Sequence, residues 1–436
     1  MRLTNVTRMA LPPGRLMSYG LTATVTATGE QLPISFDQRR HVGQGQRPAS
    51  WMAVAARLPR WVRPDDLSAA WWAVVARHGT LATAFGAADD GTLGLHRVAL
   101  EPGCWNELPV PSGQDPRQVL RALFDQACAP FQQPSHRLVL LTPHPGHPDR
   151  RPMVILGADH AHVDMWSFLV LLRDLVTCLD DRRAGRPLGA GLEAVAEFAE
   201  HTAALEARPP APVEVQRRWA ALLAAGGGAM PTFPLPLGSR DFCGESLIEV
   251  RDVLDAASAV AFASRAAELG VRTIGLAMSV LTRATRELAG APLRALFPVH
   301  SRDEPRWRDS VGWFITNSVL ECTDPDPAAC TAAVREAIRL GSYPLAPIFA
   351  PYGGMPTRPG LFALSWLDTR RLPPVPDDAD VQYVSAGVHD DGVMIWFIVN
   401  DAGLHLRARY PNTPEAMRQV PRWLDAVELG LRAIVN

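Results

Sequence analysis

The chain contains no lysine, since all 43 of its basic residues are arginine. P-loop nucleotide hydrolases, protein kinases, Schiff-base enzymes and Ser-Lys hydrolases each depend on a lysine amine or ammonium group. The absence of lysine therefore excludes these reaction classes. Any chemistry that the protein performs has to use other side chains.

Closely spaced cysteine pairs are also missing. The six cysteines are scattered along the chain without a CxxC motif: Cys104, Cys128, Cys178, Cys243, Cys322 and Cys330. This spacing favours a reduced protein over a disulfide framework or a structural zinc site. We expect a cytoplasmic protein with no bound metal.

Signals for export or membrane insertion are lacking as well. Pro12, Pro13 and Arg15 stand where a signal peptide would carry its apolar segment. The longest apolar helix that we expect, 166–179, is interrupted by Arg173 and Asp174, too early for a membrane span. We expect neither export nor a membrane-spanning segment.

A strong charge of one sign is absent too. The formal net charge is −2, and no run of basic residues is interleaved with aromatic ones, so we expect no nucleic-acid partner. The 436 residues are 47% hydrophobic and 20% charged, which is an ordinary globular composition. This length is sufficient for two or three domains.

The most informative segment that is present is 153–175. Its first residues, 153–156, form the short apolar run that is typical of a buried strand. Polar residues that include His160 and His162 crowd the exit of this strand. Apolar residues then recur at helical spacing after Asp164, so the pattern predicts Asp164 at a helix N-cap and His160 in the preceding turn.

Strands and helices alternate through both parts of the chain. A polar connector, 180–187, separates two parts of similar element content. We predict an α+β fold with two mixed sheets. The first subdomain is 1–185 and carries the His160 motif, and the second is 186–436.

His160, His162 and Asp164 spell HxHxD. In a purely structural interpretation, Asp164 is only the N-cap of the following helix and His160 is a hydrogen-bonded loop histidine. Two functional interpretations are also open from the residues alone. Imidazole and carboxylate groups at alternate positions can converge on zinc, as in a metal-dependent hydrolase. The motif lacks the further histidine that such a site needs, because Met165 follows Asp164. In the other interpretation, Asp164 caps the helix while His160 is a loop histidine that presents a ring nitrogen to a substrate, since a neutral imidazole is the usual general base near pH 7.

The segment 159–167 resembles the HHxxxDGxS motif of the condensation-domain superfamily, whose members are acyltransferases related to chloramphenicol acetyltransferase. Further segments resemble motifs of this superfamily in the same order along the chain: SFDQR at 35–39, RHGTLATAF at 77–85, VHSRDE at 299–304 and VGWFITN at 311–317. SWLDTR at 365–370 and LRARY at 406–410 are similar to the stand-alone polyketide-associated (Pap-type) acyltransferases in particular.

This resemblance implies a fold and an activity. The expected fold has two chloramphenicol-acetyltransferase-like subdomains that form a V-shaped pseudodimer with a central tunnel and crossover loops from the second subdomain. The expected activity moves an acyl group from a carrier-protein or CoA thioester to a hydroxyl or amine, in natural-product or complex-lipid biosynthesis. The alternative is a catalytically degenerate domain that serves as a docking platform for a carrier protein or partner enzyme.

The resemblance also implies roles for the motif residues. His160 is the expected general base, and Asp164 is expected to be structural and to pair with Arg302. Two positions depart from the superfamily pattern. Asp159 replaces the first histidine, and Met165 replaces the glycine after Asp164, which narrows the channel beside His160.

Other residues are expected to support the site or to line the tunnel. Asn317 is a supporting residue that can equally be a turn residue, while Trp166 and Trp313 are expected to line the tunnel. Backbone N–H groups near Met165 and Trp166, helped by Thr316, are expected to stabilise the oxyanion; Ser167 is a further candidate beside them.

The donor and the acceptor are not determined by the sequence. We expect no tightly bound cofactor, because CoA or a phosphopantetheine-linked carrier protein would be a substrate. An acyl or peptidyl carrier protein and a small-molecule acceptor are the expected partners. The sequence does not distinguish ester from amide formation.

Overall fold

The computed structural model describes residues 2–24, 31–239 and 244–435. The chain divides into two compact units. The first unit consists of Met1–Ala207, Arg302–Phe314 and Leu372–Gly387. The rest of the chain forms the second unit, in the ranges Arg208–Ser301, Ile315–Arg371 and Val388–Asn436.

This division differs from the sequential boundary at 185/186. The first unit continues to Ala207 and takes in two later segments, Arg302–Phe314 and Leu372–Gly387. Both segments follow strands of the second unit, so the chain crosses between the units more than once. Arg302–Phe314 and Leu372–Gly387 thus belong to the first unit although they come late in the chain, and the expected crossover loops stay a prediction.

The first unit is built on a seven-stranded mixed sheet with the order β1-β15-β4-β10-β9-β2-β8. β1 and β15 are parallel, and the other neighbours are antiparallel. The strands of this sheet are β1 (Arg2–Asn5), β2 (Gly14–Tyr19), β4 (Trp51–Arg57), β8 (Trp105–Leu108), β9 (His136–Pro143), β10 (Met153–Asp159) and β15 (Gln382–Ser385). Two small sheets pair β3 (Thr22–Thr24) with β7 (Ala99–Glu101) and β5 (Thr83–Ala87) with β6 (Leu93–Arg97).

The helices of this unit are α1 (Phe36–Val42), α2 (Pro64–Arg77), α3 (Pro116–Ala127), α4 (Met165–Arg183) and α5 (Phe198–Glu206). β10 is a central strand, and all seven of its residues are buried, as the apolar run predicts. Glycine at position 157 is required because a Cβ there would lie 2.6 Å from the ring of Phe124 on α3. α4 begins directly after the turn that follows β10, and its N-cap is Asp164 as predicted.

The second unit is built on a six-stranded mixed sheet with the order β11-β17-β16-β14-β12-β13. Its strands are β11 (Leu247–Asp255), β12 (Leu293–His300), β13 (Ile315–Cys322), β14 (Phe362–Asp368), β16 (Val393–Asn400) and β17 (Gly403–Tyr410). Its helices are α6 (Val213–Ala225), α7 (Ala256–Glu268), α8 (Thr273–Ala289), α9 (Pro327–Leu340), α10 (Leu345–Phe349) and α11 (Pro414–Arg432).

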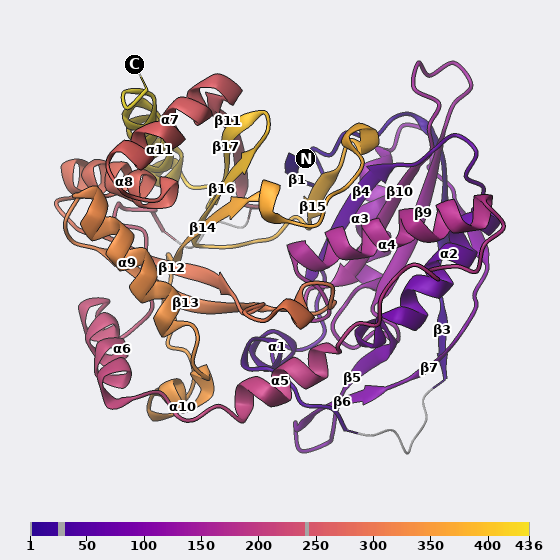
Figure 1. Cartoon of the computed structure of the whole chain (residues 1–436), viewed down its shortest axis with the longest axis horizontal. Helices are drawn as coiled ribbons and strands as arrows, with labels where there is room; N and C mark the ends of the chain where they lie inside the picture. The colour runs from indigo at the N-terminus through magenta and orange to yellow at the C-terminus, as the bar shows by residue number, and fades with distance from the viewer. Residues whose placement is uncertain (1, 25–30, 240–243, 436) are drawn as a thin grey trace. The chain divides into compact units, whose positions relative to one another are not determined.

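Figure 1 shows α7, α8, α9 and α11 gathered on one side of this second sheet. Their buried faces and the sheet form one apolar core around the rings of Phe362, Phe397 and Trp423. The predicted α+β fold with two mixed sheets is confirmed. The V-shaped arrangement around a tunnel stays a prediction.

The structure also bears on the membrane and cysteine predictions. Within 2–24, 31–239 and 244–435, no helix has the length and apolar character that spanning a bilayer requires. The cysteines in these ranges are free thiols, and Cys243 lies outside them.

Candidate functional site

The site is formed by the tight turn between β10 and α4. The N–H of His160 donates to the carbonyl of Ser50 at 3.0 Å, and the N–H of His162 donates to the carbonyl of Asp159, also at 3.0 Å. The N–H of Ala161 donates to the carboxylate of Asp159 at 2.8 Å. These bonds hold the turn against the end of the sheet, so His160 has a defined position.

The ring of His160 is held in one tautomer. Its Nδ1 lies 3.0 Å from the carbonyl oxygen of Val163, and because a carbonyl only accepts, Nδ1 carries the proton. Nε2 is then unprotonated and able to accept a proton. The ring also stacks on Trp313, with 4.0 Å between the ring centroids and an interplanar angle of 18°.

The protonation of His160 suits a base. Burial lowers the pKa of His160 below its ordinary value of 6.5, and the neighbouring His41 lowers it further. Asp159 and the bond to Val163 act in the opposite direction without reversing the shift. His160 is therefore neutral near pH 7.

Asp164 pairs with Arg302, as predicted. The carboxylate is 1% exposed and accepts from Arg302 Nη2 at 3.0 and 3.2 Å. It also accepts from the N–H of Ser167 at 2.7 Å and from the N–H of Phe314 at 3.1 Å. With these partners, Asp164 holds the start of α4 and the segment 302–314.

The segment 302–314 is organised around Arg302. Arg302 Nη1 donates to the carbonyls of Trp307 and Ser310 at 2.9 and 2.7 Å, and its guanidinium lies 3.8 Å from the centroid of the Phe314 ring. Phe314 follows Trp313 directly in the chain. The buried ion pair therefore also determines where the Trp313 ring stacks on His160.

Ser167 and Trp166 are both tied to this segment. The Ser167 hydroxyl donates to the carbonyl of Gly312 at 2.8 Å and accepts from the Gly312 N–H and from Arg302. This hydroxyl is buried and holds the segment in place; its contribution to a tunnel or oxyanion site stays a prediction. Trp166 is partly exposed, and its Nε1 donates to the carbonyl of Arg308 at 2.8 Å.

One partner of Asp159 is His41, which is not among the predicted site residues. The buried carboxylate of Asp159 lies 3.3 Å from Nε2 of His41, which is near the end of α1. Nδ1 of His41 in turn lies 2.9 Å from Nη2 of Arg47. Burial raises the pKa of Asp159, but the hydrogen bond and charge interaction with His41, together with His162 and a hydrogen bond from Ser50, outweigh it and leave the pKa below its ordinary value.

α1 also contacts the turn through Gln38. Ser35 and Gln38 form a capping box at the start of α1. Nε2 of Gln38 then donates to the carbonyl of Ala161 at 2.8 Å. His41 follows Gln38 by three residues and lies on the same face of the helix. Gln38 belongs to the SFDQR segment and His41 comes shortly after it, so this spacing is the sequence signal that could have identified His41.

Met165 and Tyr383 meet at the first turn of α4. The Tyr383 hydroxyl donates to the carbonyl of Met165. Burial raises the pKa of Tyr383 well above its ordinary value, so the hydroxyl keeps the proton that it donates. Nothing in the sequence near Tyr383 indicates this contact, because Tyr383 comes from the late segment Leu372–Gly387.

Thr316 and Asn317 lie at the start of β13, in the second unit. Both are buried, and they pair with Val299 and Pro298 of β12. Their contribution to an oxyanion site stays a prediction.

The three HxHxD side chains are directed to separate partners. Nδ1 of His162 lies 2.9 Å from the hydroxyl of buried Ser135, whereas Asp164 binds Arg302 and His160 binds Val163. No group of His, Cys, Asp and Glu side chains suited to a metal occurs among the residues described. This geometry does not favour the zinc interpretation.

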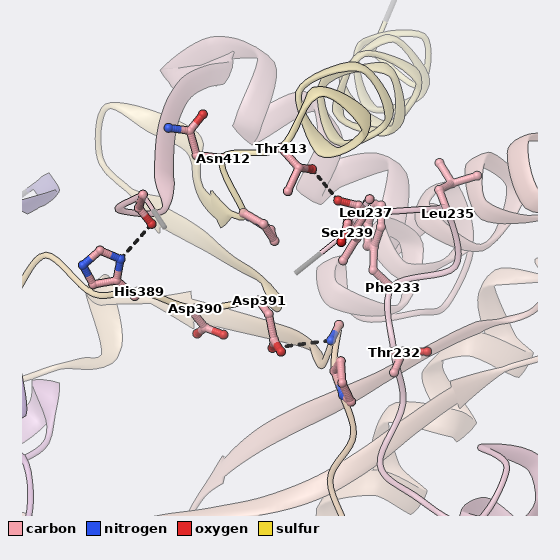
Figure 2. A pocket seen from close by; sticks show the side chains of 15 residues that line it. Thr232, Phe233, Leu235, Leu237, Ser239, His389, Asp390, Asp391, Asn412 and Thr413 are labelled. Atoms are coloured by element: carbon pink, nitrogen blue, oxygen red, sulfur yellow. Dashed lines mark hydrogen bonds between the residues drawn. The ribbon is translucent and has the colours of Figure 1, made fainter. Parts of the chain in front are cut away.

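A separate hollow of about 650 Å³ lies in the second unit (Figure 2). Three of the polar side chains at its wall make contacts within the fold. His389 Nδ1 donates to the carbonyl of Gly244 at 2.8 Å, Asp390 pairs with Arg409 at 2.6 Å, and Thr413 donates to the carbonyl of Leu237. These contacts stabilise the loops around the hollow and point to no reaction there.

Solved structures with the same fold cover nearly the whole chain. The PapA2 acyltransferase matches with a TM-score of 0.86 and 19% identity over 100% of both chains. The first condensation domain of the CDA synthetase matches with a TM-score of 0.72 and 15% identity, over 93% of this chain and 97% of that one. SgcC5 from Streptomyces globisporus matches with a TM-score of 0.65 and 18% identity, over 92% of this chain and 98% of that one.

Searches against protein-family models and against curated proteins found no match. At these identities the solved structures establish the fold and not the reaction. The structure has the two mixed sheets and the Asp164–Arg302 pair that the sequence motifs predict. The chain therefore has the fold of the condensation-domain superfamily.

Proposed function

We propose that the protein is a condensation-type acyltransferase. It moves an acyl group from a CoA or carrier-protein thioester to the hydroxyl or amine of a small-molecule acceptor, in natural-product or complex-lipid assembly. The observation that carries this proposal is the state of His160. Its Nδ1–H is held by Val163, its pKa is lowered, and its Nε2 is left with an available lone pair.

In the proposed reaction, Nε2 of His160 accepts the proton of the acceptor O–H or N–H while the oxygen or nitrogen attacks the thioester carbonyl. The tetrahedral oxyanion collapses, the C–S bond breaks, and the thiolate takes the proton back from the imidazolium. General-base assistance of this kind is typically worth about 10² to 10⁴ in rate. We assign oxyanion stabilisation to the N–H groups of Met165 and Trp166, because the N-terminus of α4 favours negative charge.

Asp164 has no proton-transfer role in this proposal. Its contacts with Arg302, Ser167 and Phe314 keep α4 and the segment that carries Trp313 in place. Holding the base within reach of two bound substrates is a large part of catalysis in general. The ion pair therefore acts on the rate through position.

The experiment is acyl transfer followed by intact-mass spectrometry. A panel of acyl thioesters on CoA and on carrier protein is combined with hydroxyl and amine acceptors, and wild type is compared with His160→Ala. We expect product from the wild type and a loss of at least about 10²-fold with His160→Ala. Exposed His144 supplies the matched control, and His144→Ala should transfer at the wild-type rate.

The pH dependence of kcat/KM gives a second readout. The base is active when neutral, so the rate should be constant at neutral pH and fall about tenfold per pH unit below the lowered pKa of His160. A half-maximal rate at or above pH 6.5 would contradict this assignment.

A docking platform for a carrier protein is the second candidate, and Met165 favours it. Met165 is partly exposed at the first position of α4, beside the turn that carries His160. Carrier-protein binding without product from either wild type or His160→Ala would support the platform and refute the acyltransferase.

A further inference from the structure

The chain Arg47–His41–Asp159 has only one consistent arrangement of protons. An arginine guanidinium donates and cannot accept, so Nδ1 of His41, 2.9 Å from Arg47 Nη2, must be the acceptor. The proton of His41 is therefore on Nε2, 3.3 Å from the carboxylate of Asp159. Arg47 also donates to the backbone carbonyl of His41 at 2.8 Å, so two hydrogen bonds hold Arg47 against His41.

Asp159 connects His41 to the turn that carries His160. It is the last residue of β10 and is fully buried, and its carboxylate accepts from the N–H of Ala161 at 2.8 Å. A buried carboxylate is costly unless several donors compensate it, and the Ser50 side chain supplies one further hydrogen bond to Asp159. His41 supplies another donor.

His41 contacts the other support of His160 as well. Its ring meets Trp313 edge to face, with 5.3 Å between centroids and an interplanar angle of 79°. Trp313 also stacks on His160 at 4.0 Å, and the rings of His41 and His160 meet edge to face with 6.0 Å between centroids. His41 therefore supports the turn through Asp159 and supports the stacked ring through Trp313.

We propose that His41, oriented by Arg47, is a positioning residue that fixes the His160 turn through its Nε2–H bond to Asp159. The proposal deepens the acyltransferase proposal, on which its effect on rate rests. In this chain the carboxylate of Asp159 and the imidazole of His41 act as one unit. His41 touches no reacting atom and acts on the rate only through His160.

Two substitutions separate the two hydrogen bonds of His41. His41→Gln places a donor N–H near the position of Nε2 and so keeps the bond to Asp159. His41→Asn places an acceptor near the position of Nδ1, so it keeps the bond from Arg47 but loses the bond to Asp159. The proposal requires the asparagine variant to be the more damaging one.

For His41→Asn we expect kcat to fall by about 10²-fold with little change in KM, since displacement of a catalytic group by about 1 Å has this effect. For His41→Gln we expect at least tenfold of that loss to be recovered. The His144→Ala control should behave as wild type. Equal losses with asparagine and glutamine, or no loss with asparagine, would overturn the proposal.

A readout independent of turnover is the titration of His160 by NMR, with ¹³C-labelled histidine and the resonance assigned by its absence in His160→Ala. The titratable or charged neighbours that shift the pKa of His160 are His41, which lowers it, and Asp159, which raises it. We expect the pKa of His160 to rise further toward 6.5 in His41→Asn than in His41→Gln, because only the asparagine variant loses the bond to Asp159, loosens the turn and admits water. Both variants remove the His41 ring, so its direct effect on this pKa is the same in the two proteins.

This titration keeps the two proposals apart. If the wild type transfers no acyl group, the acyltransferase proposal fails, while a higher pKa of His160 in His41→Asn than in His41→Gln still supports positioning. The same His160 titration in the two folded variants would refute positioning whatever the turnover. Thermal unfolding of both variants establishes that they are folded.

Discussion

At the scale of single residues, the buried charges of the first unit have structural partners. The side chains of Arg302 and Asp164 are 1% and 2% exposed, and every contact that we describe for Asp164 is to Arg302 or to a backbone N–H. Such a pair is costly to form, and removing one partner leaves a buried charge without compensation. The Asp164–Arg302 pair gives the segment that carries Trp313 a defined position.

Arg302→Ala should therefore destabilise the protein by about 3–5 kcal/mol, as expected when one partner of a buried pair is removed. The matched control is Arg306→Ala in the same segment. Arg306 pairs with Glu304 at the surface, where the side chains are 52% and 49% exposed. Arg306→Ala should therefore lower the free energy of unfolding by at most about 1 kcal/mol. Urea unfolding measures both, and equal costs would show that the pair does not hold the segment.

At the scale of elements, α1 is a short helix with two functions. Its capping box satisfies its own N-terminus, and Gln38 at the same time donates to Ala161 in the His160 turn. The two functions can be separated because a carboxylate accepts in a capping box as well as an amide does but cannot donate.

Gln38→Glu should keep the cap and lose the bond to Ala161. We expect slower transfer and a destabilisation of about 1–3 kcal/mol, since the buried carbonyl of Ala161 loses its donor. Ser35→Ala is the control, because it removes the cap acceptor at a cost of about 0.5–2 kcal/mol and leaves the Ala161 bond in place. Transfer assays that slow equally with both variants would mean that the placement of the whole helix matters and not this bond.

At the scale of the whole molecule, the first unit depends on histidines that stay neutral. Burial is the first cause that lowers the pKa values of His78, His136, His160 and His162. Burial and the nearby His162 lower the pKa of His136 to about 3. Below about pH 6.5, the histidines of the unfolded state bind protons, whereas these buried histidines of the folded state stay neutral.

The free energy of unfolding should therefore fall as the pH is lowered from about 6.5 toward 3. Each such histidine contributes at most about 1.4 kcal/mol per pH unit, because the unfolded state binds the extra proton in this window. His136→Gln keeps an N–H for the carbonyl of Leu81 and removes one of these protons, so its stability should depend less steeply on pH. Urea unfolding at a series of pH values measures the slope, and a slope equal to that of wild type and of the exposed control His144→Gln would contradict the assignment.

Much of the fold and of the candidate site is encoded in local sequence. The apolar run before His160 predicts the buried strand β10, because only such a run can lie in the middle of a sheet. Asp164 before an apolar helical pattern predicts the N-cap of α4, because the cap is formed within three residues. The ordered motifs predict the superfamily fold, which the solved structures confirm.

Other features depend on tertiary structure because they join residues that are far apart in the chain. His41 and Asp159 lie 118 positions apart, and neither residue type by itself indicates the other. Tyr383 reaches α4 only because the late segment Leu372–Gly387 packs with the first unit. Local patterns in the sequence are sufficient to predict the strand, the turn and the cap around His160. The partners of Asp159 and the packing of the late segments depend on tertiary structure, because folding brings distant side chains together and buries their polar groups.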